Sequence, residues 1–319
     1  MIAFQEHVPL APFTSLKIGG PARFFTTAAS VTELREALLF AREKGLPFGI
    51  LGGGSNLLVS DDGFRGVIIR LQMEGVRRSG CEIEAEAGVD LTGLIYRTAD
   101  WGLSGMESLA GIPGLLGGAV RGNAGAYGSC IGEVAATVFA LHAESLALLA
   151  LEREDCGFSY RSSRFKLDPR LIVVSALLVL SKGEPEAVRH KVEGTIAKRT
   201  ARHLQCEKSV GSFFMNPVVT DPELIRRFET DQQLRCRESR IPAGWLIDQS
   251  GLRNTRVGAA MVSALHANYL INTGEASADE MIRLARLVKS RVRDAMGVQL
   301  QEEVSCLGFP APEQQEVPR

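Results

Sequence analysis

The glycine-rich stretch from Gly105 to Gly128 constrains the fold of this chain more than any other feature. It reads GMESLAGIPGLLGGAVRGNAGAYG and holds eight glycines in twenty-four residues. Glycine loses more conformational freedom on folding than other residues and adds no side chain to a core, so a dense run needs a reason. A disordered linker fits poorly, because the glycines are interleaved with apolar residues that favour burial. Two alternatives remain equally open: tight turns at positive φ, and a backbone that closely approaches a ligand.

A second glycine loop lies between two predicted strands, in the segment LGGGSNLLV at residues 51–59. It lacks the lysine and the serine or threonine that end a P-loop. It also differs from the GxGxxG turn that opens a helix, because Leu57, Leu58 and Val59 continue as a strand. Taken alone, the loop is nearly as well explained by a simple turn. Two loops whose backbone N–H groups can surround phosphate favour a dinucleotide cofactor.

Composition excludes some broad classes of protein. The 319 residues suffice for two or three domains, and 45% hydrophobic with 23% charged residues is ordinary for a globular protein. A net charge of −1 and a pI near 6.6 leave no basic excess for general nucleic-acid binding. The N-terminal residues MIAFQEHVPL lack the regions of a signal peptide, and no run approaches the length of a membrane span. We therefore expect a cytoplasmic protein without membrane partners.

The cysteines indicate neither a disulfide framework nor a metal site. No two of them form a CxxC pair, and no histidine lies at the spacing of a zinc ligand. We expect reduced, packing cysteines in a cytosolic protein and no bound metal. The six are Cys81, Cys130, Cys156, Cys206, Cys236 and Cys306.

Helix and strand patterns are mixed along the chain in an α+β order. Apolar spacing, caps and glycine stops predict helices at 31–45, 91–101, 188–203, 243–249 and 277–297, and a further helix starting at 221. Apolar or β-branched runs predict strands around 67–69 and at 82–89, 171–180 and 298–307. The segment Lys182–Pro185 indicates a boundary between a mixed first part and a more helical second part.

Two short segments outside the glycine loops could carry chemistry. FSYRSSRFK, residues 158–166, places Arg161 and Arg164 beside Tyr160, and a guanidinium can bind a carboxylate through two hydrogen bonds. In SVGSFFMNP, residues 209–217, Ser212 either caps a turn or presents a hydroxyl in a cleft, but it is not the serine of a GxSxG elbow. Surface arginines and a capping serine are the plainer interpretations.

The last predicted strand holds two adjacent glutamates in VQLQEEV, residues 298–304. Along a strand, Val298, Leu300 and Val304 fall on one face and Glu303 falls on the other. A solvated strand face is enough to explain Glu303. The alternative is a carboxyl group that points into a cleft.

Taken together, these segments resemble the motifs of one enzyme family. LGGGSNLLVSDDG, GIPGLLGGAVRGNAGAYG, FSYRSSRF, GSFFMNP, AGWLIDQSGLR and VQLQEEV are similar, in this order, to motifs of UDP-N-acetylenolpyruvoylglucosamine reductase. FTSLKIGGPA at residues 13–22 is similar to the N-terminal signature of that family. The similarity runs from about Phe13 to Phe309. No tyrosine-bearing loop lies between Leu180 and Ala187, so the chain resembles the shorter class of the enzyme, which lacks this lid.

The resemblance implies an α+β protein with a two-subdomain FAD-binding fold of the vanillyl-alcohol-oxidase (PCMH) type and an α+β substrate-binding domain. We expect the FAD-binding domain at 1–185, with subdomains at about 1–74 and 75–185. The substrate-binding domain is expected at 186–297, a strand near the active site at 298–309, and a flexible tail at 310–319. No histidine lies in either glycine loop, so we expect non-covalent FAD.

The resemblance also implies which residues hold the cofactor. The 111–128 loop would wrap FAD opposite the 52–57 loop, and its glycines would let the backbone approach the pyrophosphate. The expected FAD-binding residues are Gly52, Gly53, Gly54, Ser55, Asn56, Leu57, Ile112, Pro113, Gly114, Gly117, Gly118, Asn123, Gly125, Ala126 and Tyr127.

Three catalytic residues follow by motif from the resemblance: Arg161, Ser212 and Glu303. NADPH would reduce FAD, and the flavin would give hydride to the β-carbon of an enolpyruvyl group. Arg161 and a protonated Glu303 would stabilise the negative charge that then builds toward the carboxylate. Ser212 would deliver a proton to the α-carbon as general acid. Substrate contacts are expected from Tyr160, Asn216, Gln249 and His266.

The leading hypothesis is therefore an NADPH-dependent reductase of UDP-N-acetylglucosamine enolpyruvate, which forms UDP-N-acetylmuramate for peptidoglycan and needs no protein partner. A sugar or alcohol oxidase on the same FAD-binding fold is the first alternative, although it has no evident need for the three catalytic residues. A glycine-rich binding or scaffold domain without catalysis is the second alternative, and it would purify without a yellow chromophore.

Overall fold

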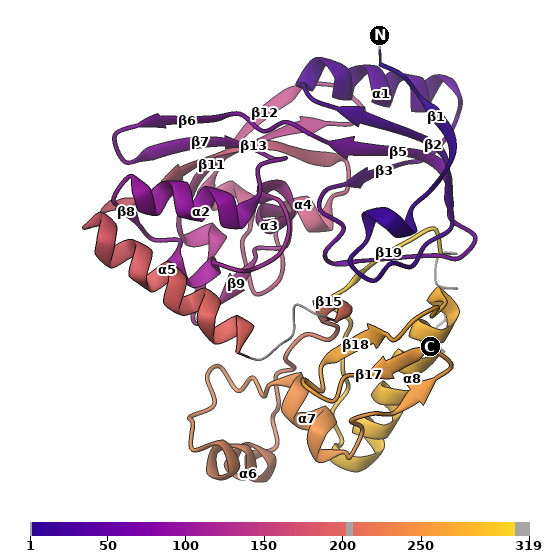
Figure 1. Ribbon diagram of the computed structural model, residues 1–319, viewed down its shortest axis with the longest axis vertical. Coiled ribbons are helices and arrows are strands. Elements are labelled where there is room, and N and C mark those ends of the chain that lie inside the picture. Colours follow the sequence, from indigo (N-terminus) through magenta and orange to yellow (C-terminus); the bar gives the residue numbers. More distant parts are fainter. Residues whose placement is uncertain (1, 202–206, 310–319) are drawn as a thin grey trace, which may run out of the picture.

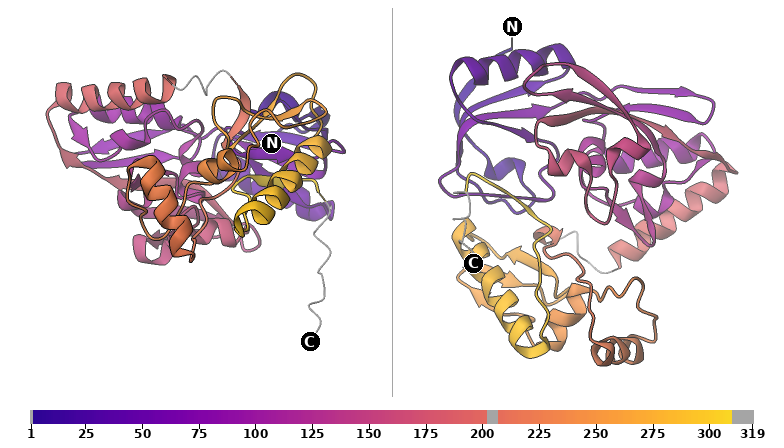
Figure 2. Two further views of the ribbon diagram at one scale, coloured as in Figure 1. Left: turned by 90° about the horizontal axis from the view of Figure 1, so that it is seen from below. Right: turned by 180° about the vertical axis from the view of Figure 1, so that it is seen from behind.

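The computed structural model describes residues 2–201 and 207–309, and its larger sheets define three units. The first and second units lie side by side, and the third lies below them (Figures 1 and 2). Helices together with parallel and antiparallel strands confirm the α+β class. The expected tail at 310–319 lies outside the described residues.

The first unit is a four-stranded sheet in the order β1-β2-β5-β3, packed against one helix. This helix, α1 (Val31–Glu43), begins where the hydroxyl of Ser30 accepts a hydrogen bond from the N–H of Glu33. Its buried residues have the helical spacing read from the sequence, and they pack on β2 and β5. The strands are β1 (Gln5–Pro9), β2 (Pro21–Ala28), β3 (Phe48–Leu51) and β5 (Phe64–Leu71).

The second unit is a five-stranded antiparallel sheet in the order β12-β11-β13-β7-β6. Its central strand, β13 (Leu171–Val179), is mostly buried, as its apolar run predicted. The other strands are β6 (Val76–Ser79), β7 (Glu82–Glu86), β11 (Ala135–His142) and β12 (Leu148–Glu152). The helices α2 (Leu91–Asp100), α3 (Leu116–Arg121) and α4 (Arg164–Leu167) accompany this sheet.

The helix α5 (Pro185–Thr200) packs on the second unit, although residues from 186 onward were expected in the substrate-binding domain. Its Val188 and Val192 belong to the same hydrophobic core as the second sheet. It also runs alongside α2 (Figure 1). The third unit therefore starts after α5. The sequence indicated where this helix begins, but it did not indicate which surface covers its apolar residues. The expected end of the helix at 203 lies outside the described residues.

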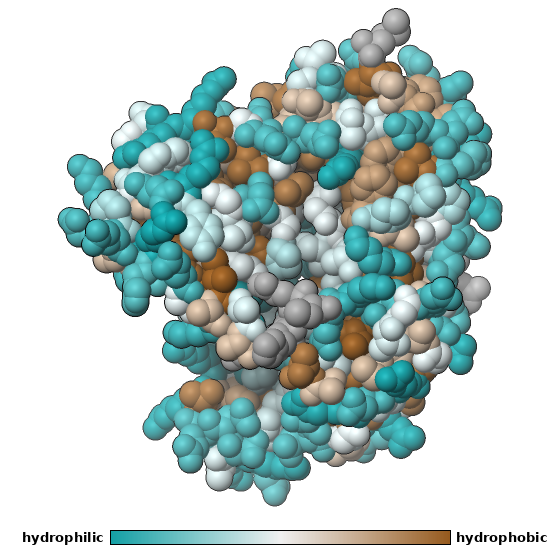
Figure 3. Space-filling model, in the orientation of Figure 1, coloured by the Kyte–Doolittle hydropathy of each residue, from teal (hydrophilic) through white to brown (hydrophobic). Residues whose placement is uncertain are grey.

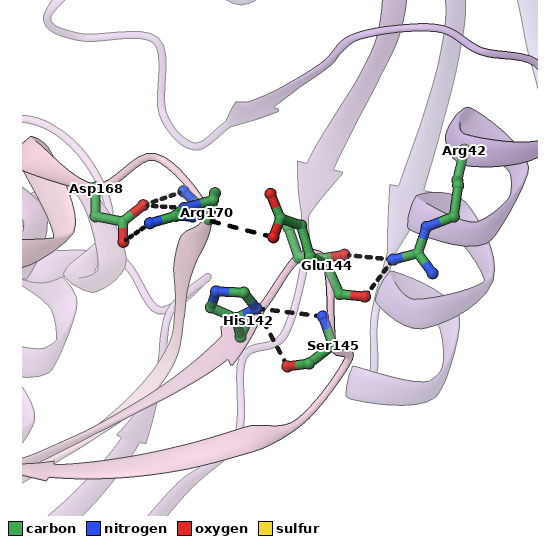
Figure 4. A network of polar contacts seen from close by, with 7 residues as sticks. Arg42, His142, Glu144, Ser145, Asp168 and Arg170 are labelled. Carbon is green, nitrogen blue, oxygen red and sulfur yellow. Dashed lines mark hydrogen bonds and ion pairs between the residues drawn. The ribbon is translucent and has the colours of Figure 1, made fainter.

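One hydrophobic core runs through the first and second units and joins buried residues of α1 and β5 with those of β7, α2, β11 and β13. A polar network adds to this contact (Figure 4). Arg42 of α1 donates hydrogen bonds to the backbone oxygens of Ala143 and Glu144, in the turn between β11 and β12. Arg170, paired with Asp168, lies beside the same turn. These contacts fix the relation between the two units that carry the glycine loops.

The third unit is a four-stranded antiparallel sheet in the order β15-β18-β17-β16, with three helices. The longest, α8 (Ala278–Met296), begins with a complete capping box between Ser277 and Glu280 and ends at Gly297, as the sequence predicted. The other helices are α6 (Pro222–Gln232) and α7 (Ala243–Gln249). The strands are β15 (Lys208–Ser212), β16 (Arg256–Val257), β17 (Ala260–Val262) and β18 (Tyr269–Asn272).

The C-terminal segment differs from the strand expected at 298–307. Only β19 (Ser305–Leu307) is a strand, and it pairs in parallel with β4 (Leu57–Val59) of the first unit. Upstream of it, a single β-bridge joins Phe214 to Glu302. One bridge is too short for a regular strand, although Val298, Leu300 and Val304 are buried as expected.

Short elements complete the described chain, and no described helix is long and apolar enough to cross a membrane. On the face drawn in Figure 3, hydrophilic residues predominate and apolar ones are scattered. The five cysteines that the structure describes are free thiols. The short elements are η1 (Ala11–Phe13), β8 (Leu103–Ser104), η2 (Glu107–Leu109), β9 (Gly125–Ala126), β10 (Ser129–Cys130), η3 (Ile131–Glu133), η4 (Arg153–Cys156) and β14 (Ser181–Lys182).

Candidate active site

The two glycine loops touch each other, although they belong to different units. The first follows β3, and the second leads into α3. The hydroxyl of Ser55 donates to the carbonyl oxygen of Pro113 at 2.9 Å. A Cβ atom added to Gly53 would lie 3.0 Å from the Cα of Gly114, so the two backbones are in close contact. The structure thus brings together both segments that were expected to hold FAD.

The glycines of the second stretch serve different purposes. Gly114 has a φ of 124°, a conformation that side chains disfavour. Gly117 packs tightly, because an added Cβ would lie 2.8 Å from the Cβ of Ala87. Gly118 has neither reason: its φ is not positive, and an added Cβ would meet no atom within 4 Å. A turn and tight packing explain the first two, whereas Gly118 exposes backbone that suits the close approach of a ligand.

A cavity of about 220 Å³ adjoins the first glycine loop. Gly52 and Gly53 line it, together with Phe13 and the cationic residues Lys17 and Arg70. Two cations beside a glycine backbone suit an anionic group such as a pyrophosphate. Sequence reasoning singled out neither cation. Lys17 lies inside the motif FTSLKIGGPA, which could have identified it as a candidate site residue. Arg70 lies on β5, outside every motif singled out in the sequence.

The end of the first loop is bonded to the C-terminal segment. The side-chain amide of Asn56 donates to the backbone oxygen of Glu303 at 3.3 Å. The N–H of Ser305 donates in return to the carbonyl oxygen of Asn56 at 3.2 Å. Leu57 then pairs with Ser305, where β4 and β19 begin. These bonds place Glu303 next to the glycine loop, a proximity that 247 residues of sequence separation concealed.

Arg161 and Glu303 form an ion pair in which the Nε of Arg161 lies 2.8 Å from the Oε1 of Glu303. Their side chains are 25% and 17% exposed, so the pair is partly shielded from water. The Nε atom has no aligned hydrogen-bond partner among the described residues, which makes this a close charge contact. Arg161 lies in a turn closed by two hydrogen bonds between Ser159 and Ser162.

Ser212 lies at the end of β15, opposite Tyr269 of β18. The segment that follows it is bonded to the C-terminal segment: the N–H of Glu303 donates to the carbonyl oxygen of Phe213 at 2.8 Å. The backbones that carry Ser212 and Glu303 are therefore neighbours. With the ion pair above, this bond brings together the three segments that carry the predicted catalytic residues, although each segment comes from a different part of the chain.

The electrostatics of this junction centre on Glu303. Burial raises the pKa of the Glu303 carboxyl above its ordinary value, while Arg161 and Lys166 act in the opposite direction. Lys166 also donates from its Nζ to the carbonyl oxygen of Arg161 at 2.9 Å. Arg121 of α3 is the third cation in this cluster. Lys166 is the last residue of FSYRSSRFK, yet sequence reasoning assigned it no role.

Two of the four predicted substrate residues lie together between the second and third units. The hydroxyl of Tyr160 accepts a hydrogen bond from the N–H of Asn216 at 3.3 Å. Arg240, which sequence reasoning missed, stacks on this pair: its Cζ lies 4.3 Å from the centre of the Tyr160 ring. Its Nη1 donates to the carbonyl oxygen of Asn216 at 3.1 Å.

The other two predicted substrate residues lie elsewhere in the third unit. His266 packs 4.8 Å, between ring centres, from Tyr269, which faces Ser212 across the sheet. Gln249 accepts a hydrogen bond from Arg227 of α6 at 2.8 Å, and it lines a groove along that helix. In the described structure, no hydrogen bond or ion pair connects Gln249 with the three predicted catalytic residues.

Asn123 differs from the other expected cofactor residues because both ends of its buried amide bond to the protein. Its Nδ2 donates to the Ser159 carbonyl oxygen at 2.8 Å, and its Oδ1 accepts from the N–H of Gly132 at 3.0 Å. Asn123 thus supports the turn that carries Arg161. No group of three or more histidine, cysteine, aspartate or glutamate residues in the described chain could hold a metal.

The last part of the glycine stretch is more open. Gly125 and Ala126 form β9, and Tyr127 is 54% exposed. The guanidinium carbon of Arg199, on α5, lies 5.4 Å from the centre of the Tyr127 ring. This contact links α5 to the glycine stretch and is a further reason why α5 accompanies the second unit.

Two stretches of the chain match known protein families. Residues 201–307 match the family described as UDP-N-acetylenolpyruvoylglucosamine reductase, C-terminal domain. Residues 22–143 match the family described as FAD binding domain. The first of these stretches begins directly after α5, where the third unit begins.

Whole-length relatives agree with these matches. The UDP-N-acetylenolpyruvoylglucosamine reductase of Synechococcus sp. (strain WH7803) is 36% identical over 314 residues, which cover 97% of this chain and 94% of that protein. The same enzyme of Carboxydothermus hydrogenoformans is 39% identical over 305 residues, covering 95% and 93%. The crystal structure of UDP-N-acetylenolpyruvylglucosamine reductase from Thermus caldophilus matches with a TM-score of 0.77 at 31% identity, covering 96% of this chain and 100% of that chain.

Proposed function

This chain belongs to the UDP-N-acetylenolpyruvoylglucosamine reductase family, and on that premise we propose which of its residues carry the reaction. It is an FAD-dependent oxidoreductase with NADPH as reductant. It reduces UDP-N-acetylglucosamine enolpyruvate to UDP-N-acetylmuramate in the synthesis of peptidoglycan precursors. A sugar or alcohol oxidase on the same fold is not favoured.

The contact between the two glycine loops supports their assignment as the non-covalent FAD site. Gly118 leaves room beside the backbone, and Lys17 and Arg70 offer positive charge next to Gly52 and Gly53. FAD held there would supply the hydride chemistry of the reaction, between NADPH and the β-carbon of the enolpyruvyl group. The first of these loops is bonded to the backbone of Glu303, so a cofactor held by the loops would lie near the proposed catalytic residues.

Arg161 and Glu303 stabilise the negative charge that develops on the substrate. Hydride addition to the β-carbon sends an electron pair toward the α-carbon and the carboxylate, and Arg161 supplies a fixed positive charge there. The buried Glu303 takes up a proton more readily than an exposed glutamate, since burial raises its pKa. A second carboxylate nearby favours this protonation further, so that Glu303 donates a hydrogen bond rather than repelling the substrate.

Ser212 delivers the proton that completes the reaction at the α-carbon. Its place directly before Phe213, whose carbonyl oxygen accepts from the N–H of Glu303, supports this role, because the hydroxyl and the carboxyl group then come from adjoining segments. Tyr160 and Asn216, together with Arg240, bind the nucleotide-sugar at the border of the third unit.

The third unit serves as the substrate-binding domain, with His266 packed behind Tyr269 and Gln249 in the groove beside α6. The five free cysteines of the described chain suit the cytoplasm, where thiols stay reduced. The enzyme acts on its small-molecule substrate without nucleic acid or an obligate protein partner.

The observation that carries these assignments is the Arg161–Glu303 contact of 2.8 Å, next to the backbone of Phe213, which directly follows Ser212. Arg161→Met tests it, because the reaction divides into flavin reduction by NADPH and flavin reoxidation by the enolpyruvyl substrate. We expect near-normal reduction and a reoxidation slowed by roughly 10²–10³-fold, as for loss of one charge-stabilising group. Arg164→Met, three residues away and exposed, is the matched control.

Two outcomes of this stopped-flow experiment would overturn the assignment. Equal slowing of both half-reactions would make Arg161 a structural residue. Rapid reoxidation by oxygen with a sugar or alcohol as reductant, and none by the enolpyruvyl substrate, would favour the oxidase.

A further inference from the structure

We propose that Lys166 positions the Arg161–Glu303 pair: its ammonium group holds the backbone turn that carries Arg161 and balances the charge of Glu303. The inference rests on the roles proposed above for Arg161 and Glu303. It adds a residue that acts through both of them and that needs no contact with the substrate.

The backbone of Arg161 needs such support. Its φ is 55°, in the left-handed region that residues with a side chain seldom adopt. Such a conformation persists only if the surroundings hold it, and in this one the guanidinium of Arg161 lies beside Glu303. Lys166 Nζ donates to the Arg161 carbonyl oxygen at 2.9 Å and thereby closes the loop from 161 to 166.

Lys166 is itself well anchored for this task. The preceding residue, Phe165, is fully buried, and the hydroxyl of Ser163 donates to the Arg121 carbonyl oxygen at 2.7 Å. The short helix α4 is therefore fixed to α3, and the Lys166 side chain starts from a rigid base. A lysine on a rigid base can hold one carbonyl oxygen in place more firmly than a lysine on a mobile loop.

Three charged groups around Lys166 determine whether its ammonium group is favoured. The charged groups that face it in the described structure are Glu303, Arg121 and Arg161. Burial, together with the two arginines, lowers the pKa of Lys166, so the site opposes its charge, and only Glu303 favours it. Because the two arginines repel an ammonium group, Glu303 is the one of these three groups that attracts Lys166.

Removal of Lys166 should therefore have two effects. The Arg161 turn loses its anchor, so the guanidinium moves from its place beside Glu303. Glu303 also loses one of the two cations that favour its charged form, and so its pKa rises further. Any step that needs neutral Glu303 then persists to higher pH, although the displaced Arg161 makes it slower.

Single-turnover reoxidation of NADPH-reduced enzyme by the enolpyruvyl substrate, measured across pH, tests both effects. We expect Lys166→Met to slow reoxidation by roughly 10- to 100-fold, the range for small misplacements, and to move the alkaline limb of the pH profile upward. Flavin reduction should be unchanged. Lys166→Arg keeps the charge, so its profile should stay in place and part of the rate should return. Arg164→Met removes a charge from the same helix and should leave both rate and profile as they are.

A thermal double-mutant cycle gives a readout that does not depend on turnover. At about pH 8, Lys166→Met should lower the melting temperature more when Glu303 is present than in a Glu303→Gln background, because an ionised Glu303 then loses its partner. At about pH 5, more of Glu303 is protonated and the two losses should become similar. The sign applies to the coupling alone: attraction between Lys166 and Glu303 requires an ionised Glu303, so it is present at high pH and fades as pH falls through the folded pKa. The raised pKa of Glu303 means that its ionisation as a whole destabilises the fold as pH rises, and the cycle subtracts this common effect.

These results separate the inference from the function it rests on. Additive melting temperatures at both pH values, with an unshifted pH profile, would overturn the role of Lys166 and leave a merely structural lysine. If wild-type enzyme failed to reoxidise with the enolpyruvyl substrate, the proposed catalytic roles would fail. The thermal cycle would still decide whether Lys166 and Glu303 are coupled. Should Lys166→Met not fold, Lys166→Gln takes its place in the thermal cycle, and additive melting temperatures at about pH 8 would refute the coupling.

Discussion

Replacement of Gly118 by alanine should stabilise the apoprotein and weaken FAD binding. Gly118 lies in α3 with a non-positive φ, and an added Cβ meets no atom within 4 Å. Alanine therefore fits the apoprotein without strain. Its neighbour Gly117 differs, because a Cβ there would lie 2.8 Å from the Cβ of Ala87.

The two effects of this change have opposite signs and can be estimated separately. In a helix, glycine is less favourable than alanine by about 0.5–1 kcal/mol, and the short first turn of α3 favours the lower value. If FAD lies against this backbone, the extra methyl group overpacks the contact and costs about 1–3 kcal/mol. Since 1.4 kcal/mol is a factor of ten, the FAD dissociation constant should rise roughly 5- to 150-fold.

The assay combines thermal unfolding of FAD-free protein with a fluorescence titration of FAD. Gly194→Ala is the matched control, because Gly194 lies in the middle of α5 and its added Cβ also meets no atom within 4 Å. We expect a similar gain in apoprotein stability from the control and no change in FAD affinity. Gly118→Ala with both a gain in stability and unchanged FAD affinity would refute the reasoning that this glycine accommodates the cofactor.

Three further predictions address the active site. Ser212→Ala should leave flavin reduction by NADPH nearly intact but slow reoxidation by the enolpyruvyl substrate by ~10²–10⁴-fold, as for loss of a general acid; equal slowing of both steps in stopped flow would make it structural. Glu303→Gln should fold and bind FAD yet lose most reoxidation activity, whereas Glu302→Gln, whose carboxylate pairs with Lys289 at 2.8 Å, should be nearly silent. Acid precipitation should release all the flavin into the supernatant, and colour in the pellet would contradict non-covalent binding.

Local sequence signals predicted most of the regular elements. The cap at Ser30, the capping box at Ser277 and the stop at Gly297 are each completed within one turn of helix, so spacing alone reveals them. The apolar run of β13 likewise predicted, without any other part of the chain, that this strand is buried. The resemblance of the motifs predicted the family, the cofactor and the three candidate catalytic residues, because each of these residues lies in a recognisable motif.

Tertiary structure decided the features that depend on which surfaces meet. The sequence of α5 contains an apolar face but does not say that α2 covers it, and 298–304 has strand-like alternation but only one β-bridge to a neighbour. Whether Gly118 is needed by the fold depends on atoms that are distant in sequence, as does the contact of Glu303 with Arg161. The partners of Lys166, the carbonyl oxygen of Arg161 and the facing carboxyl group of Glu303, were not evident from the sequence. Caps and periodicity are properties of neighbouring residues, whereas burial, charge environment and the convergence of a site arise only when separate segments pack together.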